Sequence, residues 1–162
     1  MIGLLRAYQS FRAQHHERVQ LVIIGQKGWK SEHFFQGLGL HPFHQDITLT
    51  GFVPLELLGQ AYTYTLALVY PRFHEGFGFP IVEALACGAN VICPNNSSLP
   101  EVGGQSAYYY PVEREDHLLT VARRGPDVVT RAKQGHGWAI NFSWQKYAKT
   151  FDGLFDQPAL QP

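Results

Sequence analysis

The 162-residue sequence predicts an α/β fold in which helices cover both faces of a parallel β-sheet. Short β-branched apolar runs alternate along the chain with stretches of helical periodicity, and parallel strands need such helical crossovers. Gly, Pro and Asn follow the apolar runs, as expected where strands end. The length corresponds to one domain, which we expect over 1–155, with a flexible tail over 156–162.

The first elements can be read in order. Apolar side chains at helical spacing predict the first helix: Leu4, Leu5, Tyr8 and Phe11. Residues 19–24 form a short apolar run rich in β-branched side chains that ends at Gly25, which is typical of a buried strand. A helix over 31–38 and a strand over 46–50 follow, and 51–53 form the next turn.

The later elements continue this alternation. Pro54 is suited to begin a helix with one apolar face: Leu55, Leu58 and Tyr62. We expect three more strands, at 66–70, 90–93 and 107–110. Beyond them the pattern is helical. One helix includes 118–122, another spans 128–140 with interruptions at Gly135 and Gly137, and Ser143 caps the last.

The most informative segment lies between the strand at 66–70 and the helix after it. Glu75 and Glu83 are separated by seven residues that include Gly76, Gly78 and Pro80. Glycines leave backbone N–H groups accessible, and the start of a helix carries partial positive charge that favours phosphate. Carboxylates accept hydrogen bonds from sugar hydroxyls. The segment therefore suggests a nucleotide-sugar site. The alternative is that both carboxylates only cap backbone N–H groups or face water.

The whole run from Pro71 to Gly88 resembles retaining glycosyltransferase family 4, whose members have the GT-B fold. The resemblance continues through 91–102 and 142–144, and upstream through 21–25 and 47–53. It implies a Rossmann-like domain that forms the C-terminal, donor-binding half of a GT-B enzyme. The family's first strand of this half, with an Arg and a Lys for the donor diphosphate, has no counterpart before the first helix. We therefore expect a gap or an exposed edge in the sheet.

The resemblance also implies roles for particular residues. Glu75 would contact the donor sugar and is the one catalytic candidate, and Glu83 would bind ribose hydroxyls. The further donor-binding candidates are Gly76, Phe77, Gly78 and Phe79 at the diphosphate and sugar, Phe52 and Val53 at the nucleobase, and His74 at the sugar. For Phe52 a place in the core is an equal alternative, and for His74 a packing role is favoured. No cofactor and no metal are expected; His41 and His44 are interpreted as solvated loop residues.

The expected function is donor binding for a retaining enzyme that transfers a hexose to a glycan or lipid-linked acceptor. Residues 25–29 and 96–101 are similar to a mannosyltransferase-like subset, which suggests GDP-mannose over a UDP-sugar. The expected partner is an N-terminal acceptor-binding domain, without which the chain would be inactive. The alternative is a nucleotide-binding or self-assembling fragment without turnover, associating through a sheet edge or the last helix.

The composition indicates whether nucleic acid or a membrane is a plausible partner of the chain. Thirteen basic and thirteen acidic residues give a formal net charge of zero, which does not favour nucleic acid or an anionic membrane. No apolar run is long enough to cross a bilayer. We expect a cytoplasmic location, with any contact to the inner membrane made through the missing half.

Overall fold

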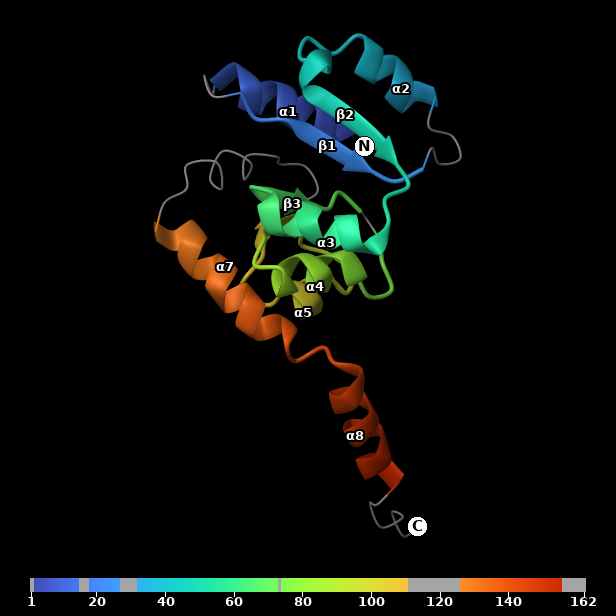
Figure 1. Cartoon of the computed structure of the whole chain (residues 1–162), viewed down its shortest axis with the longest axis vertical. Helices are drawn as coiled ribbons and strands as arrows, with labels where there is room; N and C mark the ends of the chain where they lie inside the picture. Colours follow the sequence, from blue (N-terminus) through green and yellow to red (C-terminus); the bar gives the residue numbers. More distant parts are fainter. Residues whose placement is uncertain (1, 15–17, 27–31, 73, 111–125, 156–162) are drawn as a thin grey trace.

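The computed structural model describes residues 2–14, 18–26, 32–72, 74–110 and 126–155 (Figure 1). The helices are α1 (Ile2–Gln14), α2 (Glu32–Gly39), α3 (Leu55–Tyr64), α4 (Phe79–Ala86), α5 (Leu99–Gly103), α7 (Pro126–Ala139) and α8 (Trp144–Phe155), with the 3-10 helix η1 (His44–Asp46). The strands are β1 (Leu21–Ile24), β2 (Ile47–Gly51), β3 (Ala67–Val69), β4 (Asn90–Pro94) and β5 (Tyr108–Tyr110). The helix expected at 118–122, Lys27 and Trp29 of the mannosyltransferase-like pattern, and the tail 156–162 lie outside the described residues.

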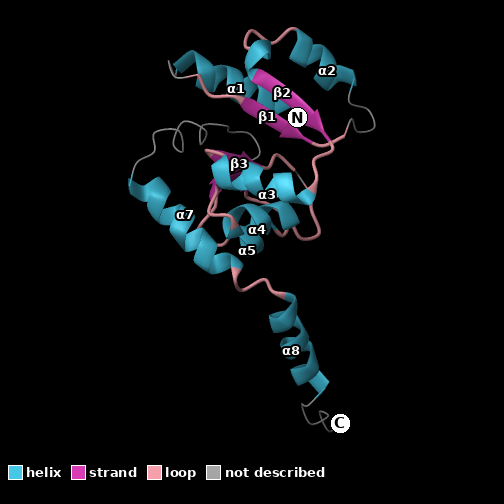
Figure 2. Ribbon diagram, in the orientation of Figure 1, coloured by secondary structure: helices cyan, strands magenta, loops and turns pink. Residues whose placement is uncertain are grey.

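The predicted α/β alternation and parallel pairing are confirmed, but the described strands form two sheets (Figure 2). One sheet has the order β1-β2 and the other the order β3-β4-β5, and every ladder within them is parallel. Within the described residues no ladder joins β1 to β3. The expected gap in the sheet is therefore found between these two strands, each of which is an edge strand.

The larger sheet carries the main core. Its largest fully buried side chains come from α4, β4 and α5 and include Ile81, Leu85, Ile92, Leu99, Val91 and Val102. All five residues of β4 are buried, as expected of a central parallel strand. Helix α4, which follows the Glu75 loop, is therefore held in place by its packing in the core.

Helix α7 corrects a prediction, because it runs without a break through Gly135 and Gly137. Gly135 is buried against α4, and a Cβ built on it would lie 2.6 Å from Cδ2 of Leu85. This glycine allows two helices to approach closely instead of ending one.

The smaller sheet is less buried than its sequence predicted. Val22 is 49% exposed and Ile24 is 39% exposed, so β1 is not a strand buried on both faces. The reason is that the sheet has two strands and the described helices leave this face open. Asp46, expected in a strand, instead ends η1 and is buried.

Two buried polar residues, Asp46 and His41, connect the elements around the smaller sheet. Nη1 of Arg12 donates to Oδ2 of Asp46 at 2.7 Å, and Arg18 also donates to Asp46. The hydrogen bond from Arg18, and then the charges of both arginines, lower the pKa of Asp46. His41, expected in solvent, is 5% exposed, and its Nε2 lies 2.9 Å from the carbonyl oxygen of Leu5. Its ring packs on Tyr8, so it is a structural histidine.

Helix α8 extends away from the rest of the molecule (Figure 1). The N–H of Lys146 donates to Oγ of Ser143 at 3.2 Å, which confirms the predicted cap at the start of α8. Trp144 is 75% exposed and Tyr147 is 63% exposed. No helix in the described ranges has both the length and the apolar character needed to span a membrane.

Candidate functional site

The loop that leads from β3 into α4 turns at Gly78. Gly78 precedes the helix with a φ of +100° and is buried, and a Cβ there would lie 3.0 Å from Cδ2 of Leu99. Both facts require glycine at this position. Pro80 follows in the first turn of α4, where its missing N–H leaves no bond unmade. The helix therefore begins with its first N–H groups directed into the loop.

The loop before α4 and the first residue of the helix carry N–H groups without a backbone acceptor in the part of the chain that the structure describes. The N–H of Ile81 bonds to the carbonyl oxygen of Gly78 at 2.9 Å, which closes the first turn. The N–H groups of residues 76–79 make no such bond among the described residues. Four consecutive donors at the positive end of a helix form a suitable place for an anion.

Glu75 lies at the edge of this loop. Its side chain is 25% exposed, Oε1 accepts a hydrogen bond from the Tyr70 hydroxyl at 2.8 Å, and Nε of Arg72 is 3.5 Å from the same oxygen. Burial, and secondly the hydrogen bond to Glu75, raise the pKa of Tyr70 to about 12. Tyr70 therefore remains a proton donor at neutral pH, and Glu75 is held as an acceptor.

Glu83 is on the second turn of α4 and has a similar partner. Its Oε2 accepts a hydrogen bond from the hydroxyl of Tyr62 at 3.0 Å. Tyr62 is 8% exposed, and burial followed by the charge of Glu83 raises its pKa. Helix α4 has no side-chain cap, which excludes the capping half of the alternative, and both glutamates are partly buried.

The loop after β4 donates side-chain hydrogen bonds to the backbone of the Glu75 loop. Oγ of Ser97 donates to the carbonyl oxygen of Glu75 at 2.7 Å, and Oγ of Ser98 donates to the carbonyl oxygens of Glu75 and Phe77, each at 3.0 Å. Ser97 has a φ of +53°, unusual for a residue other than glycine. The loops that follow β3 and β4 therefore meet at one sheet edge, as predicted for parallel strands.

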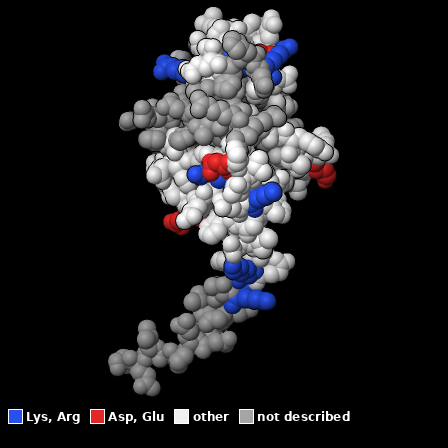
Figure 3. All heavy atoms as spheres, turned by 90° about the vertical axis from the view of Figure 1, so that its left-hand side faces the viewer, with Lys and Arg blue, Asp and Glu red and all other residues white. Residues whose placement is uncertain are grey.

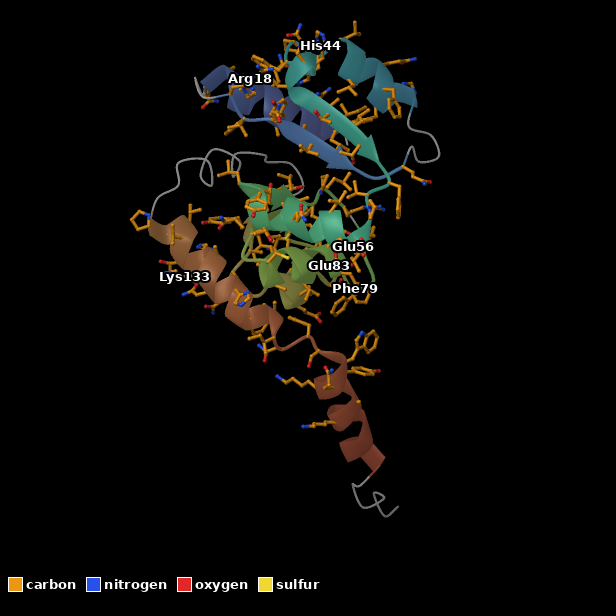
Figure 4. The ribbon with its side chains drawn as sticks, in the orientation of Figure 1. Arg18, His44, Glu56, Phe79, Glu83 and Lys133 are labelled. Carbon is orange, nitrogen blue, oxygen red and sulfur yellow. The ribbon has the colours of Figure 1, made fainter. Side chains whose placement is uncertain are left out.

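The remaining predicted residues are divided between the core and solvent. Phe77 packs inward, with its ring 5.7 Å from that of Phe142. Phe79 is 58% exposed and Phe52 is 74% exposed, so the core alternative for Phe52 is wrong. His74 is exposed, which does not support its packing alternative, and Val53 is partly buried. Figure 4 shows Phe79 and Glu83 on the same side of the molecule as Glu56, at the start of α3.

The sequence did not identify four residues that donate hydrogen bonds to Glu83 or to the Glu75 loop: Tyr62, Tyr70, Ser97 and Ser98. Tyr62 had been assigned to an apolar helix face and Tyr70 to the end of a strand. The one available signal was their polar tip beside a carboxylate motif. On the face drawn in Figure 3, described basic and acidic side chains are interspersed without a large patch of one sign. Within the described residues no group of three or more potential metal ligands is found.

The site contains two carboxylate groups, each held by a hydrogen bond from a tyrosine, and the consecutive backbone N–H groups of residues 76–79. The donors suit phosphate oxygens and the carboxylates suit hydroxyl groups. A ligand that carries both kinds of group would use all of them.

Comparison with known proteins gives a consistent result. Residues 2–119 match the family described as Glycosyl transferases group 1. O-antigen chain mannosyltransferase B of Escherichia coli is 34% identical over 147 residues, which are 88% of this chain and 39% of that protein. The chain thus spans about two fifths of the length of this curated relative.

Solved structures agree on the fold. The C-terminal domain of a glycosyl transferase group 1 family protein (LpcC) from Francisella tularensis superposes with a TM-score of 0.72 at 17% identity, over 87% of this chain and 77% of that one. The pneumococcal O-GlcNAc transferase GtfA, solved in complex with UDP and GlcNAc, has a TM-score of 0.73 at 20% identity. It matches 95% of this chain and 33% of its own.

Proposed function

The chain belongs to the glycosyl transferases group 1 family, and from this premise we propose that it binds the nucleotide-diphospho-sugar donor of a retaining hexosyltransferase. It has the fold of the C-terminal domain of GT-B glycosyltransferases. The observation that carries the proposal is that N–H groups at 76–79 without a backbone acceptor among the described residues lie in the same loop and helix as Glu75 and Glu83, each of which is held by a tyrosine.

In the proposed complex the diphosphate lies against the N–H groups of 76–79 at the start of α4. Glu83 accepts from ribose hydroxyls, and Glu75 accepts from a hydroxyl of the donor sugar. Phe52 and Val53 border the nucleobase, and His74 is a further sugar contact. Support for this arrangement is that residues 52–53 follow β2 and the Glu75 loop follows β3, since ligands of open α/β sheets gather at the carboxyl ends of strands.

The proposed reaction transfers the sugar with retention at the anomeric carbon. As the bond to the diphosphate breaks, negative charge grows on the leaving oxygens, and preorganised N–H dipoles stabilise it without any motion. We propose that these dipoles and positive charge from the rest of the enzyme act in place of a bound metal. Glu75 is the catalytic residue of the proposal because it is the carboxylate nearest the sugar.

The proposed donor is GDP-mannose and the proposed pathway polysaccharide biosynthesis in the cytoplasm. Support comes from the relative of 34% identity, whose name is that of an O-antigen mannosyltransferase. Because the chain covers 39% of that relative, acceptor binding and turnover are assigned to an N-terminal domain on the remaining part. A UDP-sugar is the competing donor.

Calorimetry tests the proposal directly. The 162-residue chain is titrated with GDP, UDP, GDP-mannose and a UDP-hexose, and we expect saturable binding of one nucleotide pair. Glu83→Ala should abolish it at concentrations that saturate the unmodified chain. Asp127→Ala is the matched control, since Asp127 also accepts from a tyrosine, Tyr108, but on α7. A chain that binds none of these ligands at millimolar concentration would contradict the proposal.

A second candidate is a self-assembling fragment without turnover. The observations that favour it are the edges of β1 and β3, which carry no further ladder among the described residues, and the exposed Trp144 and Tyr147 of α8. Exposed sheet edges and aromatic patches promote association. This candidate predicts that the average mass of the particles in solution rises with protein concentration.

A further inference from the structure

Two tyrosines hold the two carboxylates of the site, one each. We propose that Tyr62 positions Glu83 for the nucleoside and that Tyr70 positions Glu75 for the donor sugar, so that each tyrosine controls a different part of one ligand. The inference rests on the proposed function and extends it to residues outside the Glu75–Glu83 run.

The geometry of the two pairs is alike. The Tyr62 hydroxyl is 3.0 Å from Oε2 of Glu83, and the Tyr70 hydroxyl is 2.8 Å from Oε1 of Glu75. The tyrosines come from different elements, since Tyr62 lies in α3 and Tyr70 directly follows β3. Both elements precede the glutamates in the chain and pack on the same core. The core therefore fixes where each hydroxyl is.

Each tyrosine occupies one carboxylate oxygen and leaves the other. Within the described residues, Oε1 of Glu83 and Oε2 of Glu75 accept no hydrogen bond. A carboxylate fixed through one oxygen presents its second oxygen in a defined direction, which lowers the ordering cost when a ligand hydroxyl binds there. The arrangement therefore leaves one oxygen of each carboxylate available to a ligand.

The tyrosines are also kept in the donor state. Burial is the largest cause of the raised pKa of both, and their glutamate partners raise it further. A protonated hydroxyl beside a carboxylate can only donate to it, so the direction of each hydrogen bond is fixed. The ring of Tyr62 is in the core cluster and that of Tyr70 packs against it, so replacement by Phe removes the hydroxyl and keeps the packing.

The two contacts should be separable because they serve different parts of the ligand. Loss of one net hydrogen bond corresponds to about a 2- to 10-fold loss of affinity. Tyr62→Phe should weaken GDP and GDP-mannose by the same factor, because both contain the ribose. Tyr70→Phe should weaken GDP-mannose and leave GDP unchanged, because GDP has no donor sugar. A general loss of stability would weaken both ligands in both variants.

The experiment is calorimetry on the full chain with GDP and GDP-mannose as probes, or with UDP and its hexose conjugate if the unmodified chain binds those. Tyr108→Phe is the matched control, because Tyr108 also donates to a carboxylate, Oδ2 of Asp127 at 3.3 Å, away from the loop. It should leave both affinities unchanged. In a Glu83→Gln background, Tyr62→Phe should have a smaller effect than in the unmodified chain, since the two residues act through one contact.

A second readout does not depend on a ligand. In chain labelled with ¹³C, Tyr62→Phe should move the carboxyl-carbon resonance of Glu83, and Tyr70→Phe that of Glu75. The inference is overturned if either variant leaves its partner's resonance in place, or if GDP and GDP-mannose fall equally in Tyr70→Phe. Absence of nucleotide binding by the unmodified chain overturns the proposed function, and this inference with it. Normal binding by the unmodified chain with unchanged affinities in both Tyr variants overturns the inference alone.

Discussion

Two independent features of the structure, the backbone conformation and the space for a side chain, require glycine at position 78. Its φ of +100° is a conformation that L side chains adopt rarely, and a Cβ at this position would lie 3.0 Å from Cδ2 of Leu99, which is fully buried. Gly76, two residues earlier in the same loop, has open space around the position of a Cβ. The two glycines therefore differ in kind although the sequence motif contains both.

Substitution of these glycines by Ala should give opposite results. We expect Gly78→Ala to lower the free energy of unfolding by at least about 1–2 kcal/mol, because of the left-handed backbone and the contact with Leu99. Gly76→Ala should change it by less than about 0.5 kcal/mol, as for a surface site. Urea unfolding followed by circular dichroism measures both. Equal destabilisation by the two substitutions would contradict the assigned backbone conformation.

The two glutamates of the candidate site can be identified from the sequence, whereas their hydrogen-bond partners cannot. Glu75 and Glu83 stand in a motif whose residue types and spacing carry local information. The partners of Glu83 and Glu75 lie 21 and 5 residues away, and which hydroxyl reaches which oxygen depends on how α3, β3 and α4 pack. Tyr62 satisfied an apolar helix pattern equally well, so periodicity concealed its polar tip.

Helix α7 shows why the presence of glycine alone wrongly predicts an interruption in a helix. Gly135 and Gly137 were interpreted as interruptions because glycine is a poor helix former. In the structure both are inside one continuous helix, and they face different surroundings. Gly135 packs on Leu85 of α4, whereas a Cβ on Gly137 would meet nothing within 4 Å.

This difference predicts opposite effects of Ala at the two positions. Gly137→Ala should stabilise the chain by about 0.5–1 kcal/mol, the gain in helix propensity at a free position. Gly135→Ala should destabilise it by about 1–3 kcal/mol, because Leu85 is fully buried and cannot move aside without strain. Thermal unfolding of the two variants decides the matter. Stabilisation by Gly135→Ala would show that α4 and α7 are not packed as described.

Elements with strong local patterns were predicted within a few residues, as α1, α2, β4 and β5 illustrate. The failures have a common physical cause, since burial is a property of neighbours in space. β1 has the composition of a buried strand, yet Ile24 is 39% exposed because the described part of its sheet has one partner strand. His41 lies in a polar loop pattern, yet it is buried because α1 packs over it and Leu5 offers a carbonyl.

At the scale of the whole molecule, the two separate sheets and the extended α8 leave apolar surface uncovered. Val22 and Ile24 lie on one face of β1, and Trp144 and Tyr147 lie on α8. Their exposure favours association in the absence of an N-terminal domain, and a partner domain that covered them would remove the tendency. The assembly candidate and the donor-binding proposal therefore differ in what they expect of the chain alone and of the chain within a larger enzyme.

Static light scattering on the 162-residue chain tests this expectation. We expect a weight-average mass that rises with protein concentration, because β1 and α8 present apolar surface to other copies. Ile24→Lys and the pair Trp144→Gln with Tyr147→Gln should each reduce the rise, since they place charge or polarity on these surfaces. Leu40→Gln is the matched control, because Leu40 is 87% exposed but lies in the turn after α2, and this change should leave the concentration dependence unaltered. A mass equal to that of one chain at every concentration would remove assembly as a function and leave donor binding as the sole candidate.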